Sequence, residues 1–361
     1  MNAVYVHIPF CRHICSYCDF CKVLHIDNFV DDYLDALQDE ILSTYDGELI
    51  KTLYIGGGTP SCLTSKELIK LFRILENFKK TPDCEYTFEC NPDDITDELL
   101  DILVSAGVNR VSIGVESFDK NNLKFMERNL DYDDLAHKLE LLRNRGIDNI
   151  NLDLIYALPN ETLNIVKSDI KKLISLNPTH ISTYSLIIED HTVLKTNNTK
   201  YISEDLDRKM YDIIVKSLEK SGYKHYEVSN FAKPGYESKH NMNYWLNNEY
   251  YGFGLGATGY KAGLRYTNTK NLSEYIHGKY HKEEVLTNIK EQMDNEIMLG
   301  FRLLDGIDVN LFYDKYGLNI QDVYPAIKEL LKTHELRYKS GMLSISPEYI
   351  YVMDAILVKI L

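Results

Sequence analysis

The chain of 361 residues has no run of roughly eighteen apolar residues, so the sequence predicts no membrane-spanning helix. It lacks the charged and then apolar opening of a secretory signal peptide, and we expect a cytoplasmic protein. Basic residues are too few to balance the acidic ones, and the formal net charge of −14 argues against nucleic acid as a partner. No internal repeat is visible, so we expect one large domain with an appendage, or two domains.

Cysteines are also few, and three of the seven are gathered in one short segment. Without a secretory signal, these cysteines are more plausibly thiols or metal ligands than disulfides. Cys11, Cys15 and Cys18 form a Cys-x3-Cys-x2-Cys loop directly after a strand-like stretch at residues 4–7. Structural zinc sites are usually closed by four ligands, whereas thiolates in one tight loop usually hold an iron–sulfur cluster. The alternatives are a zinc knuckle or three ordinary thiols.

This cysteine spacing resembles that of the radical S-adenosylmethionine (SAM) superfamily, in which three cysteines leave one iron free for the methionyl end of SAM. Cys21 follows closely, and as a fourth ligand it would close the cluster and block SAM. A free or supporting thiol is therefore favoured at this position, with a redox role left open. Cys62, Cys84 and Cys90 have no metal-ligand spacing and are expected to be small buried residues.

Strand-like and helix-like segments alternate through the first half of the chain. Strands are expected at 4–7, 52–55, 86–90, 110–114, 149–155 and 180–186. Strands separated by helices indicate βαβ units and a parallel sheet. About six units are fewer than the eight of a closed TIM barrel. The predicted fold class is therefore α/β, with a partial (β/α)6 TIM-like barrel of the radical SAM type.

The pattern changes after about residue 197, where a helix near 204–221 is followed by loops rich in Tyr and Asn. From about residue 291, three helices and a hairpin around Ser340 and Gly341 predict a small α+β domain resembling a winged helix. We therefore divide the chain into a barrel at 1–196, a barrel-completing and linking region at 197–288, and a small C-terminal domain at 289–361.

Further polar and glycine residues end or follow the predicted strands, where parallel barrels carry their sites. The loop at 56–60 reads Gly-Gly-Gly-Thr-Pro, and glycines let a backbone approach a ligand closely. Glu89, Glu116 and Asp153 end or follow later strands, and ionised carboxylates accept hydrogen bonds from ribose hydroxyls or an ammonium group. Arg128 could pair with a carboxylate. Strand-end capping is the alternative for each residue singly, but the series favours one pocket.

His240 begins a stretch, residues 240–245, that contains the single tryptophan. A histidine beside aromatic residues can ligate heme iron axially. From the residues alone, a structural histidine that satisfies local hydrogen bonds is favoured.

Together these motifs resemble the HemW-type heme chaperones, relatives of the oxygen-independent coproporphyrinogen III oxidases. The resemblance extends over nearly the whole chain. It is carried by residues 7–11, 56–61, 107–115, 153–159, 226–230 and 240–245.

The resemblance implies a [4Fe–4S] cluster on Cys11, Cys15 and Cys18. It implies SAM contacts at Tyr5, Gly57, Gly58, Thr59, Glu89, Glu116, Arg128 and Asp153. Glu116 stands where relatives usually carry glutamine, and so replaces a donor and acceptor by an acceptor alone. The heme motif of the family corresponds to His240, Asn241 and Tyr244.

The implied function is a chaperone that delivers heme to respiratory proteins. The alternatives are an oxidase that converts two propionates of coproporphyrinogen III to vinyls, or another radical SAM enzyme acting on a tetrapyrrole. The oxidases carry an N-terminal extension, whereas this sequence starts three residues before its first strand, which favours the chaperone together with the His240 motif. The implied partners are heme or a porphyrin, the receiving proteins and an electron donor, with a homodimer as one assembly.

Overall fold

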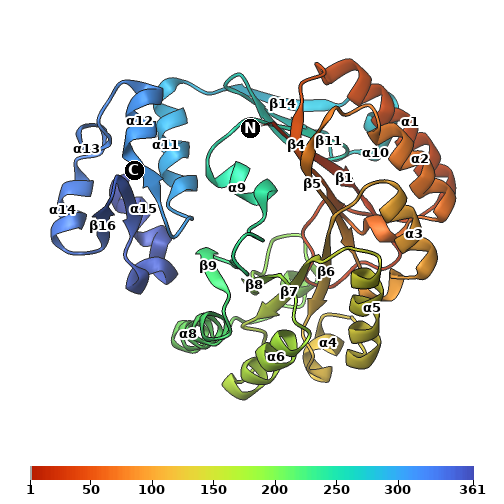
Figure 1. Cartoon of the computed structure of the whole chain (residues 1–361), viewed down its shortest axis with the longest axis horizontal. Coiled ribbons are helices and arrows are strands. Elements are labelled where there is room, and N and C mark those ends of the chain that lie inside the picture. Colours follow the sequence, from red (N-terminus) through yellow and green to blue (C-terminus); the bar gives the residue numbers. More distant parts are fainter. Residues whose placement is uncertain (1) are drawn as a thin grey trace.

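A computed structural model describes residues 2–361, in which an open parallel barrel forms most of the molecule (Figure 1). Its strands lie side by side in chain order: β1 (Ala3–Ile8), β4 (Ile50–Gly57), β5 (Lys80–Cys90), β6 (Arg110–Glu116), β7 (Asn149–Tyr156) and β8 (His180–Ser185). Outside them lie α1 (Asp27–Thr44), α2 (Ser65–Leu75), α3 (Asp97–Ser105), α4 (Lys120–Phe125), α5 (Tyr132–Asn144) and α6 (Leu163–Ser175). The predicted partial barrel of six parallel strands is confirmed.

The sheet continues beyond these strands at both edges. Next to β1 it adds β11 (Tyr250–Phe253), β12 (Thr258–Lys261), β13 (Leu264–Asn268) and β14 (His281–Leu286). Beyond β8 it adds β10 (Asn230–Ala232) and β9 (Lys224–Glu227). β11 runs parallel to β1, while the other additions are antiparallel. Three helices accompany them: α7 (Val193–Thr196), α8 (Glu204–Lys220) and α10 (Leu272–Ile276). The region expected to be mostly loops is thus largely regular.

The C-terminal part packs as a separate small unit beside the barrel (Figure 1). It contains α11 (Ile289–Gly300), β15 (Ile307–Asp308), α12 (Val309–Tyr316), α13 (Ile320–Val323), α14 (Ala326–Lys332), β16 (Leu336–Lys339), β17 (Met342–Ile345) and α15 (Met353–Ile360). The expected hairpin turns at Ser340 and Gly341, both with positive φ, as a two-residue hairpin requires. The sequence did not predict β15 or the terminal helix. In the part of the chain that is described, no helix is long and apolar enough to cross a membrane.

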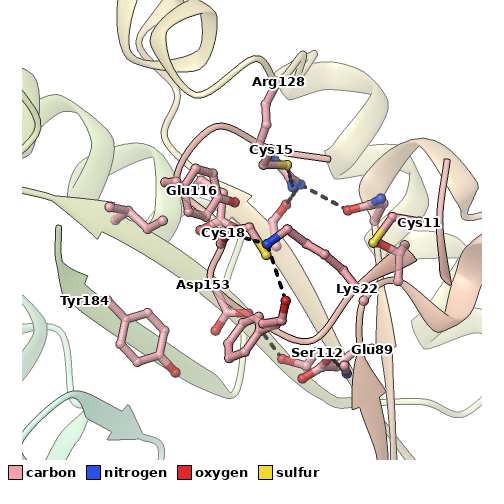
Figure 2. Close-up of a pocket in the computed structure, with 18 of the residues that line it drawn as sticks. Cys11, Cys15, Cys18, Lys22, Glu89, Ser112, Glu116, Arg128, Asp153 and Tyr184 are labelled. Carbon is pink, nitrogen blue, oxygen red and sulfur yellow. Dashed lines mark hydrogen bonds between the residues drawn. The ribbon is translucent and has the colours of Figure 1, made fainter. Parts of the chain in front are cut away.

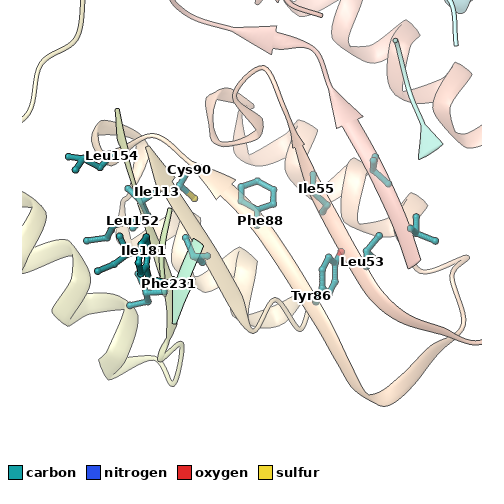
Figure 3. Packing of buried hydrophobic residues seen from close by; sticks show 14 of the residues in the cluster. Leu53, Ile55, Tyr86, Phe88, Cys90, Ile113, Leu152, Leu154, Ile181 and Phe231 are labelled. Carbon is teal, nitrogen blue, oxygen red and sulfur yellow. The ribbon is translucent and has the colours of Figure 1, made fainter. Parts of the chain in front are cut away.

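Successive side chains along each strand point to opposite faces of the sheet, and this alternation separates the apolar core from the interior of the barrel. Apolar side chains such as Leu53, Phe88 and Ile113 point outward and pack beneath the helices (Figure 3). Burial of this apolar surface stabilises the fold by roughly 25 cal/mol per Å². The positions between them, such as Tyr54 and Glu89, point inward and line the cavity described below. The same alternation that builds the core therefore assembles a polar barrel interior.

Glu40 on α1 is a fully buried carboxylate that joins this helix to the loop after β11. It accepts hydrogen bonds from Gly254 N at 2.9 Å, from Asn268 Nδ2 at 2.6 Å and from the hydroxyl of Tyr275. Burial raises the pKa of Glu40 to about 7.

We expect Glu40→Ala to lower the free energy of unfolding by at least about 3 kcal/mol, because three buried donors would lose their acceptor. The exposed neighbour Asp39 provides the control, and Asp39→Ala should leave the free energy of unfolding within about 0.5 kcal/mol of wild type. Urea unfolding of both variants measures the difference, and equal stabilities would contradict the role of Glu40.

Candidate functional site

A cavity of about 790 Å³ opens at the carboxyl ends of the barrel strands (Figure 2). Ten of the residues that the sequence singled out line it: Cys11, Cys15, Cys18, Gly57, Gly58, Thr59, Glu89, Glu116, Arg128 and Asp153. Tyr5 and His240 lie outside it. The fold thus brings the cysteine loop, the glycine loop and the polar strand ends to one place.

The cysteine loop is held at both ends by a short parallel pair of strands, β2 (Phe10–Cys11) and β3 (Val23–Leu24). Hydrogen-bond donors face two of its sulfurs: Thr59 Oγ1 lies 3.5 Å from Cys11 Sγ, and Arg128 Nη1 lies 3.8 Å from Cys15 Sγ. Burial raises the pKa of the Cys11 thiol to about 11. Donors and positive charge at sulfur suit thiolate ligands, which a bound metal keeps deprotonated.

These thiols fit a cluster of several irons better than a single ion. Among the described residues, no three His, Cys, Asp or Glu side chains converge on a position for one metal ion. A cubane instead receives each thiolate at a separate iron, so its ligands need not converge on a point. The lining of one cavity by Cys11, Cys15 and Cys18 meets this requirement.

Cys21 does not line the cavity. Its side chain packs against Gly256, where an added Cβ would come within 2.9 Å of the Cys21 Cβ. Its carbonyl oxygen lies 2.7 Å from His7 Nε2. This position corresponds to the favoured interpretation of Cys21 as a thiol that does not bind the cluster.

The glycine loop approaches its neighbours more closely than other residues would allow. Gly57 has φ +122°, and a Cβ there would come within 2.8 Å of the His7 ring. A Cβ on Gly56 would come within 2.7 Å of the Glu89 carboxylate. These two glycines therefore let the end of β4 lie directly against the cavity wall.

Two inward carboxylates line the cavity. Glu89 accepts hydrogen bonds from the Tyr54 hydroxyl at 2.7 Å and from Gly57 N at 3.0 Å, and burial raises its pKa to about 7. Asp153 accepts from Asn151 Nδ2 at 2.8 Å, and burial also raises its pKa. Both groups are held in fixed positions and favour a cationic or hydroxyl-bearing ligand.

Glu116 and Arg128 line the cavity near Cys15 (Figure 2). Arg128 Nη2 donates to Gly114 O at 2.6 Å and to Asn91 Oδ1 at 3.2 Å. Glu116 has φ +65°, a strained conformation for a residue with a side chain, and such strain often marks functional sites. Burial raises the pKa of Glu116 to about 7, against the opposing effect of the Arg128 charge.

Sequence reasoning missed several residues that line the same cavity: Tyr54, Arg110, Ser112, Asn151, Ser182 and Tyr184. Except for Tyr54, each lies an even number of residues from a predicted site residue or from another of these on the same strand. A polar residue at every second position of an otherwise apolar strand is the signal that would have found them.

His240 lies on α9 (Lys239–Trp245) and is 2% exposed. Its Nδ1 is 2.9 Å from Thr52 Oγ1, and its Nε2 is 2.8 Å from the Tyr244 hydroxyl. Burial lowers its pKa to about 3, so the ring is neutral. Both ring nitrogens already have partners. Tyr5, the other predicted residue outside the cavity, bonds His7 Nδ1 through its hydroxyl at 3.0 Å.

Comparison with known proteins extends these observations. Residues 5–173 match the radical SAM superfamily, and residues 289–355 match the HemN C-terminal domain. A heme chaperone HemW from Lactococcus lactis is 43% identical over 332 residues, covering 90% of this chain and 87% of the relative. The Bacillus subtilis protein of the same name is 38% identical, covering 94% and 93%, and the Escherichia coli one is 32% identical, covering 91% and 90%.

The solved structure of E. coli coproporphyrinogen III oxidase (HemN), described as a radical SAM enzyme, superimposes with a TM-score of 0.87. It covers 99% of this chain and 89% of the oxidase, and at 23% identity the likeness is one of fold. The HemW proteins are more than 30% identical to this chain over most of both chains, which is stronger evidence of family membership than the likeness of fold to the oxidase. The chain belongs to the HemW family of heme chaperones within the radical SAM superfamily.

Proposed function

We propose that this protein is a heme chaperone that binds a [4Fe–4S] cluster, SAM and heme, and delivers heme to respiratory proteins. The observation that carries the proposal is the single cavity where three free thiols meet a glycine loop and two buried carboxylates. The names of the HemW relatives support heme as the cargo.

In this proposal Cys11, Cys15 and Cys18 hold the cluster, which supplies a one-electron reductant when it is bound. The backbone of Gly57, which lines the cavity, and the carboxylates of Glu89 and Asp153 hold the polar groups of SAM. Thr59 and Arg128 stabilise the thiolates by donating hydrogen bonds to two of them. The remaining predicted contacts at Tyr5, Gly58 and Glu116 belong to the same proposed site.

SAM affinity is expected to rise about tenfold between pH 6 and pH 8. Burial raises the pKa of Glu89 to about 7, so it is mostly protonated at pH 6 and mostly ionised at pH 8. SAM carries a sulfonium charge and prefers the ionised carboxylate. Equilibrium dialysis of cluster-loaded protein across this range measures the effect. Glu89→Gln serves as the control, since it leaves the titration of SAM itself and of the other cavity carboxylates, Glu116 among them. Identical pH profiles of the variant and the wild type would contradict the role of Glu89.

His240, Asn241 and Tyr244 are proposed as part of the heme site. Because His240 is buried and its Nδ1 is bonded to Thr52 on β4, its coordination to heme iron requires α9 to move away from Thr52. We further propose that an electron donor reduces the cluster and that the protein is cytoplasmic. We also propose that the chain divides into three parts, which end at residues 196, 288 and 361.

Oxygen-independent coproporphyrinogen III oxidase is the second candidate, favoured by the close likeness of fold to HemN. Anaerobic incubation of reconstituted protein with coproporphyrinogen III, SAM and a strong reductant separates the two candidates. We expect no divinyl product while a known oxidase beside it is active. Formation of that product at a catalytic rate would overturn the chaperone assignment.

A further inference from the structure

Helix α9 forms part of the floor of the cavity. Asn241 lines the cavity directly, and the adjacent His240 packs its ring against Tyr54, with ring centroids 5.0 Å apart. Tyr54 donates from its hydroxyl to Glu89, and Glu89 accepts from Gly57 N. A continuous series of contacts therefore runs from α9 to a carboxylate of the proposed SAM site.

The position of His240 is fixed on several sides. Besides the ring contacts with Thr52 and Tyr244, its backbone N–H donates to Glu85 Oε1 at 2.9 Å. The N–H of Lys239 donates to the other oxygen of Glu85 at 3.1 Å. A buried carboxylate thus satisfies the free N–H groups at the start of α9 and holds the helix against the sheet.

A second series of hydrogen bonds leads from the start of α9 to Asp153. The N–H of Ser238 donates to the Tyr226 hydroxyl at 3.3 Å, and that hydroxyl lies 2.7 Å from His180 Nε2. His180 Nδ1 lies 2.6 Å from Asn151 Oδ1, and Asn151 Nδ2 donates to Asp153 at 2.8 Å.

The directions of these hydrogen bonds are mutually consistent. Burial lowers the pKa of His180, so the ring is neutral and carries one proton. Asn151 Oδ1 can only accept, which places that proton on Nδ1 and makes Nε2 an acceptor for the Tyr226 hydroxyl. The Tyr226 oxygen then accepts from Ser238 N. Every donor and acceptor that links the series therefore has a partner, and this fixes the relative positions of its residues.

We propose that α9 is a positioning element for the SAM site, through His240 toward Glu89 and through Tyr226 toward Asp153. It follows that heme coordination by His240, which requires α9 to leave the barrel floor, opposes SAM binding. This coupling rests on the proposed function, whereas the positioning role does not. Helix α9 then has two alternative positions, one in the SAM-bound protein and one in the heme-coordinated protein.

The positioning role is tested by SAM affinity of cluster-loaded variants under anaerobic conditions. We expect His240→Ala and Tyr226→Phe each to weaken SAM binding about tenfold, the size expected for the loss of one or two neutral hydrogen bonds. His240→Gln should recover most of the affinity, because an amide can bond both Thr52 and Tyr244. Lys239→Ala, at an exposed position of the same helix, should bind SAM like wild type.

Cluster content and thermal unfolding are measured on the same samples, so that misfolding is distinguished from loss of positioning. Wild-type SAM affinity in both His240→Ala and Tyr226→Phe would overturn the positioning role, even if their unfolding temperatures fall.

The coupling is tested by titrating SAM in the presence of saturating heme. We expect heme to weaken SAM binding at least tenfold and SAM to weaken heme binding by the same factor, because coupling of equilibria is reciprocal. Unchanged SAM affinity in heme-loaded protein would overturn the coupling. If wild type takes up no heme, the proposed function fails, while the positioning role is still decided by the SAM affinities.

Discussion

Cys18→Ser is expected to abolish assembly of the [4Fe–4S] cluster, whereas Cys21→Ser is expected to leave it intact. Cys18 lines the cavity with Cys11 and Cys15, and a cubane that already leaves one iron without a protein ligand cannot lose another thiolate. Serine is a poor replacement because its hydroxyl is far harder to deprotonate than a thiol. Cys21 packs against Gly256, away from the cavity. Iron and sulfide content after anaerobic reconstitution, together with visible absorption, measures the difference.

Thermal unfolding of the apo forms provides the control for this pair. Both substitutions replace a partly buried thiol by a hydroxyl of similar size, so both apo proteins should unfold within a few degrees of wild type. A full cluster in Cys18→Ser would contradict the three-cysteine site. Loss of the cluster in Cys21→Ser would instead make Cys21 a fourth ligand.

Glu89→Gln is expected to weaken SAM binding at least about a hundredfold while the cluster is retained. The carboxylate accepts from both Tyr54 and Gly57, and an amide would turn its NH2 group toward one of these donors. The substitution also removes the negative charge that faces the SAM cation in a buried site, where charge interactions are strong. Equilibrium dialysis at pH 8, where Glu89 is mostly ionised, gives the largest difference.

Glu161→Gln is the matched control. Glu161 is also buried with a pKa raised to about 7, and it accepts from Asn122 Nδ2 at 2.9 Å and from Leu158 N at 3.1 Å. It does not line the cavity. Its substitution should lower stability without changing SAM affinity. Equal losses of affinity in the two variants would show that Glu89 acts on folding rather than on the ligand.

Local signals in the sequence were sufficient for the barrel and for most of the candidate site. Each barrel strand, β1 and β4 to β7, is followed by a helix close in sequence, so its pairing partner is the next barrel strand in chain order. Parallel strands end at the same edge, and this rule brings Cys11, Gly57, Glu89 and Asp153 together without knowledge of the structure.

The features that were not predicted depend on contacts between distant parts of the chain. Strand β11 pairs with β1, where Tyr250 lies beside Ala3. Neither segment carries a sequence signal that predicts its pairing with the other. The burial of His240 likewise depends on Thr52, which lies on a strand 188 residues earlier in the chain. The sequence placed this motif among loops rich in Tyr and Asn, whereas in the structure it forms helix α9.

Heme transfer is the measurement that tests the central claim most directly. Anaerobically reconstituted protein would be loaded with one equivalent of heme, freed of excess heme, and mixed with the apo form of a heme-dependent respiratory protein. The account predicts that the acceptor gains heme and activity faster than it does from free heme at the same concentration. Heme that is never retained, or that stays on this protein while the acceptor remains inactive, would contradict it.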